Sequence, residues 1–360
     1  MINLHYKLQR AEFLLDVNLD LPMKGITGLF GVSGAGKTSL LRCIAGLEQP
    51  TAGKLIVAGD VWDDSDTNTA RSVRQRNVGY VFQEPRLFEH LSVRANIEYG
   101  QKRRKSNGAA SLDHVVGLLG LENLLPRHVA ELSGGEAQRV AIARALLCAP
   151  RFVLMDEPLA SLDQSRRDEI LPFLDRLHAE AEIPIIYVSH NIDEVCRLCD
   201  HLVVIDEGCV AGDGELQDVL VRMDIPALDG DHAGSVIEGR AGQYDANDEL
   251  TRLEFSGGDL WVPGRAAADG SSLRLRIRAS DVSLCRKRPE QSTILNILPA
   301  EVEALQHGDG PSMLVRLVLG DDRVLARVTK RSIRELHLQP GDKVFAQIKS
   351  VAVRASFTAG

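Results

Sequence analysis

The sequence predicts an α/β domain with a mostly parallel sheet, followed by a smaller all-β, barrel-like domain. Up to about residue 225, short apolar runs alternate with longer segments of helical periodicity, a pattern typical of parallel sheets. Past residue 245 the chain changes to short strands separated by turns. We therefore expect an α/β domain at 1–228, a linker with the first accessory strands at 229–288, and a small β domain at 289–355.

The elements of the first domain follow from its apolar runs. Four of them, ITGLFGV, FVLMDEP, IPIIYVSH and HLVVIDEG, are expected to be buried strands. The stretches after Lys37, Gly134 and Asp163 have helical spacing and good helix formers, so each should be a helix. The following stretch, DGDHAGSVIEGRAGQYDANDE, is polar and rich in glycine, and it is expected to be a linker.

Strands of alternating polarity characterise the rest of the chain. The segment SSLRLRIRAS places Leu273, Leu275 and Ile277 on one face and three arginines on the other. The segment MLVRLVLGDDRVLARV is expected to form two strands about the turn GDD. This pattern predicts a β domain rather than further α/β units.

Composition excludes several classes of protein. The 360 residues are 44% hydrophobic and 26% charged, as in soluble globular proteins, and a net charge of −8 argues against a nucleic-acid binder. No apolar stretch reaches the roughly 18 residues of a membrane span, and the start, MINLHYKLQR, lacks a signal peptide's apolar core. The six cysteines suggest no disulfide framework, and we expect the pair in CRLC to be a helix-face pair without function.

A phosphate-binding loop is the first chemical signature. The segment GVSGAGKT fits G-x-x-x-x-G-K-[ST] and lies between a strand and a helix pattern, so its backbone N–H groups should face an anion. Lys37 can reach the β- and γ-phosphates and Thr38 can offer its hydroxyl to Mg²⁺. The residues expected to bind the nucleotide here are Gly31, Val32, Ser33, Gly34, Ala35, Gly36, Lys37 and Thr38.

Two acidic residues end the apolar strand in FVLMDE. Asp156 is placed to hold the metal. Glu157 is placed to polarise a water that attacks the γ-phosphate, which is the role of a general base. Beside the phosphate-binding loop, this pair is better explained as catalytic than as a solvated acidic turn.

A second anion site precedes the helix in LSGGEAQRVAIARAL. Ser133, Gly134 and Gly135 stand at its start, where backbone N–H groups face outward. Because Lys37 already holds one nucleotide, we expect these residues to meet the γ-phosphate bound by a second copy of the chain.

With these motifs in order, residues 1–225 resemble the ABC ATPase family. LSGGE resembles its signature motif, ASLD its D-loop, Gln83 in YVFQEPRLF its Q-loop glutamine, and His190 in YVSHNIDE its switch histidine. The resemblance implies ATP and Mg²⁺ as cofactors and an ATP-sandwich homodimer. It implies that Gln83 links the metal and attacking water to the transporter, and that His190 contacts the γ-phosphate. The residues then expected at the metal are Thr38, Gln83 and Asp156.

The aromatic residue that stacks on the base in that family is open in this sequence. Tyr6 and Phe13 both precede the phosphate-binding loop, in YKLQRAEF. Stacking suits any purine, so the preference for ATP rests on the resemblance.

The chain resembles the separate ATPase subunits of bacterial importers. It has one ATPase unit, no sustained heptad between Lys37 and Ser133 and no fused membrane helices. The resemblance implies two membrane permease subunits as partners, contacted near Gln83 and EPRLFEHLSVRANIEYG, and a peripheral place on the cytoplasmic face of the cell (inner) membrane.

The tail points to the cargo. QSTILNILPAEV and VFAQIKSVAV resemble the Mop module of molybdate-handling proteins, and GVSGAGKTSLL and EPLASLD resemble the ATPase subunits of molybdate importers. A periplasmic molybdate-binding protein would then be an indirect partner. In Mop modules an arginine lies in the stretch where this chain has Ile294 and Leu295, while Lys349 and Ser350 could hold a dianion; the domain could also serve only to pack subunits. An importer ATPase for sulfate, sugar or polyamine and an ATP-switched molybdate sensor are the alternatives.

Overall fold

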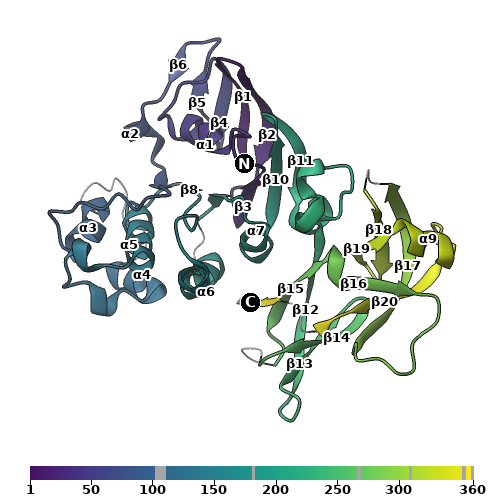
Figure 1. The fold of residues 1–360 in the computed structure, drawn as a ribbon. Helices are drawn as coiled ribbons and strands as arrows, with labels where there is room; N and C mark the ends of the chain where they lie inside the picture. The colour runs from purple at the N-terminus through teal and green to yellow at the C-terminus, as the bar shows by residue number, and fades with distance from the viewer. Residues whose placement is uncertain (102–110, 181–182, 266–268, 308–309, 351–353, 358–360) are drawn as a thin grey trace. The chain divides into compact units, whose positions relative to one another are not determined.

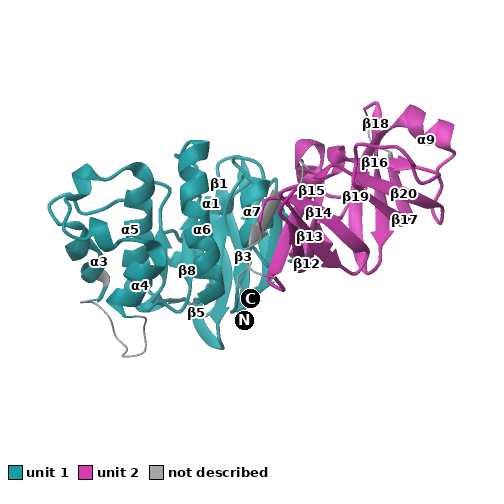
Figure 2. Ribbon diagram, turned by 90° about the horizontal axis from the view of Figure 1, so that it is seen from below, with its two compact units in different colours: residues 1–214 teal, residues 215–360 magenta. Residues whose placement is uncertain are grey.

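The computed structural model describes the chain except for residues 102–110, 181–182, 266–268, 308–309, 351–353 and 358–360. It divides into two compact units, Met1–Gly214 and Glu215–Gly360 (Figures 1 and 2). The first unit therefore ends before residue 228, where the sequence placed the boundary. Among the described residues, none of the helices has the length and apolar character needed to span a membrane.

The first unit is built on an eleven-stranded sheet in the order β6-β5-β4-β1-β2-β11-β10-β3-β9-β8-β7. Its strands are β1 (Ile2–Arg10), β2 (Phe13–Leu21), β3 (Ile26–Phe30), β4 (Ala52–Val57), β5 (Asp60–Asp64), β6 (Thr69–Ala70), β7 (Gly79–Val81), β8 (Val153–Asp156), β9 (Ile185–Val188), β10 (His201–Asp206) and β11 (Cys209–Glu215). The four predicted strands are confirmed as β3, β8, β9 and β10, and β10-β3-β9-β8-β7 pair in parallel. The strands from β6 to β2 pair antiparallel, which the sequence did not predict.

Helices follow the parallel strands, and the three predicted ones are confirmed as α1, α5 and α6. A cluster of α3, α4 and α5 lies to one side of the sheet in Figure 1. The helices of this unit are α1 (Lys37–Ala45), α2 (Val73–Arg76), α3 (Val93–Gln101), α4 (Leu112–Leu119), α5 (Gly134–Leu146), α6 (Gln164–Glu180) and α7 (Ile192–Leu198).

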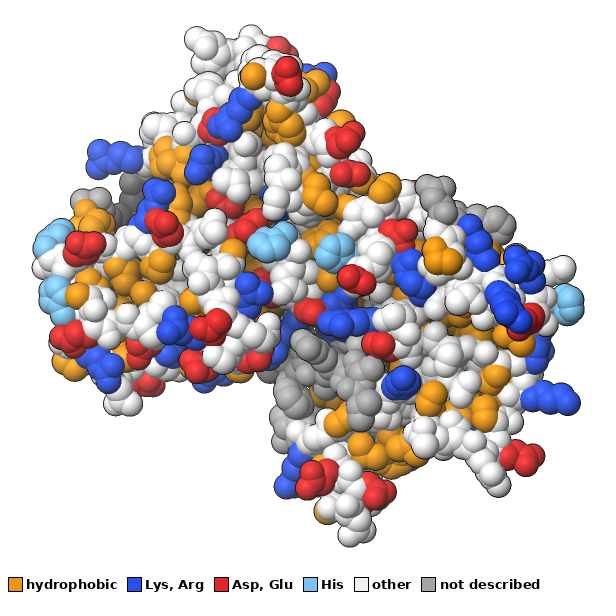
Figure 3. All heavy atoms as spheres, viewed as in Figure 1, with side chains coloured by type: hydrophobic (Ala, Val, Ile, Leu, Met, Phe, Trp, Pro, Cys, Tyr) orange, Lys and Arg blue, Asp and Glu red, His pale blue; other side chains and the backbone are white. Residues whose placement is uncertain are grey.

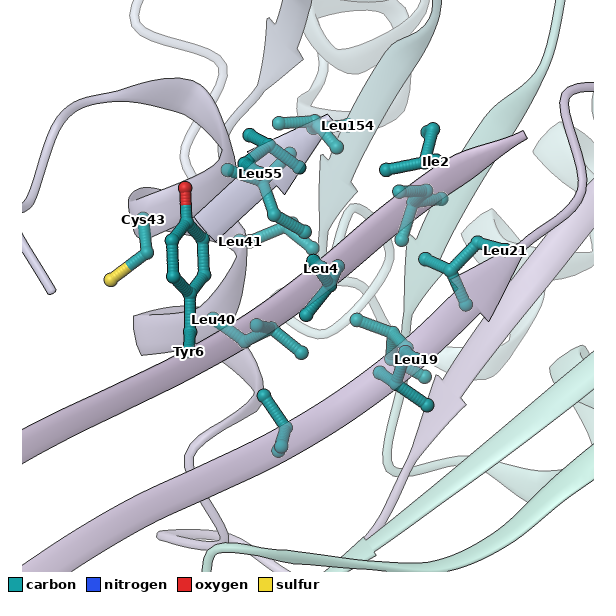
Figure 4. Packing of buried hydrophobic residues seen from close by; sticks show 14 of the residues in the cluster. Ile2, Leu4, Tyr6, Leu19, Leu21, Leu40, Leu41, Cys43, Leu55 and Leu154 are labelled. Carbon is teal, nitrogen blue, oxygen red and sulfur yellow. The ribbon is translucent and has the colours of Figure 1, made fainter. Parts of the chain in front are cut away.

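The core beneath the phosphate-binding loop joins β1, β2 and α1. Leu4 of β1 and Leu19 of β2 point toward Leu40 and Leu41 of α1 (Figure 4), and all four are buried. Burying each such side chain contributes about 1.5–3 kcal/mol to folding. This packing fixes the helix whose first residue is Lys37.

The second unit consists of two antiparallel five-stranded sheets, ordered β14-β13-β12-β15-β21 and β16-β20-β17-β18-β19. A single hydrophobic cluster takes side chains from both sheets, so the barrel-like β prediction is confirmed. The described residues of this unit also form two short α-helices. The elements are α8 (Leu216–Leu220), β12 (Gly234–Asp245), β13 (Leu250–Phe255), β14 (Gly258–Pro263), β15 (Ser272–Arg278), β16 (Val282–Cys285), β17 (Asn296–His307), β18 (Ser312–Leu319), β19 (Asp322–Thr329), α9 (Lys330–Leu336), β20 (Lys343–Ile348) and β21 (Arg354–Phe357).

The prediction of a polar linker after residue 228 is wrong, because β12 occupies most of it. This strand lies between β13 and β15 and buries Val236 and Ile237. Its glycines permit close contact: a Cβ on Gly239 would lie 2.4 Å from the Glu254 carbonyl oxygen. Glycine here marks close approach of backbones rather than a flexible connection.

The predicted two-faced strand is β15, and both of its faces are covered. Leu273, Leu275 and Ile277 are buried, as expected, but Arg274 is also buried, at 6% exposure. Its guanidinium lies 2.7 Å from the Glu238 carboxylate of β12, which supplies the countercharge that a buried cation needs.

Candidate nucleotide and hydrolysis site

The phosphate-binding loop, residues 31–36, connects β3 to α1, and the structure requires glycine at two of its positions. A Cβ on Gly31 would lie 2.1 Å from the carbonyl oxygen of Ile205. Gly36, the N-cap of α1, has φ 103°, which L side chains rarely adopt. The backbone therefore turns tightly into the helix, and its first N–H groups form the start of an anion site.

Lys37 is placed inside this loop. Its side chain is buried and its Nζ donates to the carbonyl oxygens of Gly31, at 2.8 Å, and Val32, at 2.9 Å. Burial lowers the pKa of Lys37, and the Glu157 and Asp156 carboxylates oppose that shift. The cation is thus held at the point where a phosphate chain would enter the loop.

Thr38 and Asp156 come together although they lie far apart in sequence. The Thr38 hydroxyl donates to Asp156 Oδ1 at 2.8 Å. Mg²⁺ is typically held by one or two carboxylates together with substrate phosphates, and this hydroxyl and carboxylate fit such a site. Within the described chain, no group of three or more His, Cys, Asp or Glu residues is arranged to hold a metal by itself, so phosphate oxygens would have to complete the shell.

Tyr80 on β7 is a site residue that the sequence analysis missed. Its hydroxyl donates to the second oxygen of Asp156 at 2.9 Å. Burial raises the pKa of Tyr80, and Asp156 raises it further, so the phenol remains a donor that orients the carboxylate. Only the pairing of β7 with β8 brings the two together; the tyrosine in YVFQ carries no motif of its own.

Glu157 and His190 stand at the ends of the neighbouring strands β8 and β9. His190 Nδ1 lies 3.0 Å from Glu157 Oε2. Glu157 has φ 46°, and a non-glycine residue in this region stores on the order of 1–3 kcal/mol of strain, as is common at functional sites. Its N–H donates to Val188 O at 3.1 Å. The strained backbone thus presents one carboxylate toward one imidazole.

Ser133 is the N-cap of α5. Its hydroxyl accepts from the Glu136 N–H at 3.3 Å, while the Ser133 N–H donates to Glu136 Oε2 at 2.7 Å. Gly134 and Gly135 pack closely, because Cβ atoms there would lie 3.2 Å from Leu162 and 3.3 Å from Ile170. In Figures 1 and 2, α5 lies apart from α1, the helix that follows the phosphate-binding loop.

Gln83 follows β7 and is exposed. Of the three predicted metal residues, Thr38 and Asp156 are joined directly by a hydrogen bond. The loop around Gln83 is instead tied to α5. The buried Gln138 donates to the Phe82 carbonyl oxygen at 3.3 Å, and Arg144 donates to the next part of the loop, at Pro85 and Arg86.

The structure distinguishes the two aromatic candidates. Tyr6 is fully buried and its hydroxyl donates to Asp63 Oδ2 at 3.2 Å, which removes it from contact with a ligand. Phe13 is partly exposed, and its ring lies 2.8 Å from the Cβ position of Gly36. Of these two candidates, Phe13 is therefore the one beside the phosphate-binding loop.

The predicted anion residues of the tail are partly engaged by the protein itself. The buried Asn296 donates to Ser350 Oγ and to the Trp261 carbonyl oxygen, both at 3.0 Å, and accepts from the Trp261 N–H at 2.7 Å. Leu295 is 56% exposed, and Lys349 is exposed. The last residues of VFAQIKSVAV, 351–353, lie outside the described residues.

Cys196 and Cys199, the pair in CRLC, are both buried, at the end of α7.

On the face shown in Figure 3, Lys and Arg side chains lie among Asp and Glu side chains. The mixture agrees with the moderate net charge of −8.

Comparison with known proteins gives consistent matches along the chain. The ABC transporter family matches residues 14–160 and the TOBE domain matches residues 292–355. A structure of CbiO1 from Clostridium perfringens, part of the ABC transporter complex CbiONQ, aligns with TM-score 0.52 and 26% identity over 62% of this chain and 92% of that one.

Curated relatives cover both units. The molybdenum import ATP-binding protein ModC 1 of Azotobacter vinelandii is 49% identical over 98% of each chain. ModC of Methylococcus capsulatus is 48% identical over 98% of this chain and 99% of that one. ModC of Pseudomonas aeruginosa is 47% identical over 98% and 99%, respectively. This chain belongs to the family of molybdenum import ATP-binding proteins, within the ABC transporter ATPases.

Proposed function

We propose that this chain hydrolyses ATP to energise the import of molybdate through partner permease subunits. The observation that carries the hydrolytic part is the placement of Glu157 opposite His190, 3.0 Å apart, next to the Thr38–Asp156 pair and Lys37. The cargo rests on relatives named for molybdenum import, which match 98% of the chain, including its tail. A sulfate, sugar or polyamine importer and an ATP-switched sensor are not favoured by that similarity.

Each residue has a distinct part in the proposed reaction. Lys37 and the loop N–H groups bind the phosphates, and Thr38 and Asp156 hold Mg²⁺, which neutralises charge on the phosphoryl group when bound. Glu157 orients the attacking water and takes its proton. His190 keeps the Glu157 carboxylate in place and would contact the γ-phosphate.

A second copy of the chain would complete each site. Ser133, Gly134 and Gly135 lie at the start of α5 and present helix N–H groups suited to a phosphate, yet α5 lies apart from the phosphate-binding loop of the same chain. We therefore propose a homodimer that closes on two ATP molecules. Closure would move the two permease subunits, with the chain on the cytoplasmic face of the inner membrane and a periplasmic molybdate-binding protein delivering cargo.

The permease would dock on the loop that contains Gln83 and on residues 84–100. Gln138 and Arg144 of α5 hydrogen-bond to the backbone of this loop. A shift of α5 on dimer closure would therefore move the loop with it. We propose that Gln83 approaches the metal and the attacking water only in the closed dimer.

Phe13→Ala is expected to raise the KM for ATP with little change in kcat. Stacking of one base on an aromatic ring is worth about 1–3 kcal/mol by alanine substitution, which corresponds to roughly 5- to 150-fold in KM. The measurement is steady-state hydrolysis against ATP concentration, with Phe13→Trp as the control that keeps a stacking face. Equal KM values for Phe13→Ala and wild type would remove the ring from the base site.

The cargo is tested by uptake of labelled molybdate in cells that lack this gene, with labelled sulfate measured in parallel. We expect the deletion to abolish high-affinity molybdate uptake and to leave sulfate uptake unchanged, and the wild-type gene to restore the loss. Unchanged molybdate uptake in the deletion strain would remove the cargo and leave the hydrolytic site to be assigned to another importer.

A further inference from the structure

A buried polar network lies directly behind His190. Glu194, on α7, has a side chain only 6% exposed. Its Oε2 accepts hydrogen bonds from the Tyr187 hydroxyl, at 2.9 Å, and from the Ser189 hydroxyl, at 2.8 Å. Ser189 is the residue before His190, and Tyr187 lies within β9. Glu194 therefore anchors the end of the strand that presents the histidine.

Arg167, on α6, anchors the chain segment next to Glu157, the partner of His190, in a comparable way. Its Nε donates to the carbonyl oxygens of Leu159, at 3.2 Å, and Leu162, at 3.0 Å, and its Nη2 donates to that of Ala160, at 3.4 Å. These carbonyls belong to the turn that follows Glu157, where the Ala160 N–H donates to the Glu157 carbonyl oxygen at 3.1 Å. The guanidinium thus fixes the segment from which Glu157 emerges.

The two anchors are joined to each other. Arg167 Nη1 lies 3.9 Å from Glu194 Oε1. A buried carboxylate must be paired and hydrogen-bonded to remain charged, and Glu194 has this cation and two hydroxyl donors. Burial raises the pKa of Tyr187 and the Glu194 carboxylate raises it further, so the phenol keeps its proton and donates a hydrogen bond to Glu194. We call Arg167, Glu194, Ser189 and Tyr187 the buried bridge.

We propose that Arg167 and Glu194 are positioning residues for hydrolysis, which set the geometry of Glu157 against His190 by tying together the turn after one and the strand before the other. This inference rests on the proposed ATPase function. Neither side chain is placed to touch the nucleotide. Each acts through the segment it holds, so a movement of the turn at residues 159–162 reaches His190 through the buried bridge.

The effect expected from losing this bridge falls on turnover rather than on nucleotide binding. Lys37, Thr38 and Asp156 bind the phosphates and metal without help from α7. The Glu157 carboxylate and the His190 imidazole would no longer be held at a fixed distance. A displacement of about 1 Å in a catalytic group can reduce the rate on the order of 100-fold.

A second ion pair between the same two helices provides a matched control. Arg197 of α7 and Asp175 of α6 form a two-pronged contact, with Nη2 2.5 Å from Oδ2 and Nε 3.1 Å from each oxygen. This pair joins helix to helix and holds neither the turn after Glu157 nor the strand before His190. Its loss should weaken the α6–α7 contact and leave the site geometry intact.

The test compares Glu194→Gln, Arg167→Met and Arg197→Met in the full-length chain, with kcat, the KM for ATP and the melting temperature measured for each. We expect the first two to lower kcat by about tenfold or more with KM within about twofold of wild type. Arg197→Met should keep wild-type kcat even where its melting temperature falls as far. Ser189→Ala removes a single hydroxyl and no charge, and it should also lower kcat. It serves as the test variant if Glu194→Gln and Arg167→Met do not fold.

A double-variant experiment separates positioning from general stability. In a His190→Ala background, where there is no histidine left to position, Glu194→Gln should reduce the remaining rate by less than about twofold. Additive losses would overturn the proposal, and so would an equal loss of kcat in Arg197→Met or unchanged kcat in Glu194→Gln. A wild-type chain that does not hydrolyse ATP would instead overturn the proposed function itself.

Discussion

Glu157→Gln is expected to abolish turnover and to leave ATP bound. The amide keeps the size of the carboxylate and can still accept the bond from His190, but it cannot take the proton of the attacking water. Loss of a general base costs about 100- to 10,000-fold in rate. Lys37, Thr38 and Asp156 are untouched, so the nucleotide should remain in place and hold two copies of the chain together.

Two measurements check this expectation: steady-state ATP hydrolysis, and the molar mass of the purified chain with and without Mg-ATP. We expect a dimer that persists with ATP in the variant and is transient in wild type. Glu169→Gln, on the exposed side of α6, is the control and should behave as wild type. Hydrolysis by Glu157→Gln at the wild-type rate would show that another group is the base.

Lys37→Met is expected to remove nucleotide binding rather than turnover alone. The ammonium is the cation enclosed by the loop, and its two bonds to the Gly31 and Val32 carbonyls show that it reaches across it. A hydrogen bond to a charged group contributes about 1.5–3 kcal/mol, so the loss of two phosphate contacts should weaken ATP binding on the order of 100-fold or more.

Binding of a fluorescent ATP analogue measures the effect. The exposed Lys24, which precedes β3, provides the control variant Lys24→Met, which should bind as wild type does. Wild-type affinity in Lys37→Met would contradict the placement of the phosphates against α1.

The motif residues could be predicted because their chemistry is local in sequence. The loop before Lys37 follows the run ITGLF, and the acidic pair Asp156 and Glu157 ends the run FVLMDE. Such largely apolar runs are recognisable without knowledge of their neighbours. The contacts between motifs could not be predicted in the same way. Tyr80 meets Asp156, and Arg167 meets Glu194, only because of strand order and helix packing.

The predictions that were wrong or left open concern residue types that are compatible with two different structural environments. The polar, glycine-rich segment that forms β12 is typical of a linker, whereas Gly239 permits a close approach to the Glu254 carbonyl in a central strand. Tyr6 and Phe13 were equivalent in sequence, and only burial separates them. Burial of Tyr6 depends on the packing of α1 against β1 and on the pairing of β1 with β2 and β4, which no single segment encodes.

The most direct test of the account is labelled molybdate uptake in cells that lack this gene and carry either the wild-type chain or Glu157→Gln, expressed to the same level. If hydrolysis at this site powers import, uptake should return with the wild-type chain and stay at the deletion level with the variant. Molybdate uptake restored equally by Glu157→Gln would contradict it.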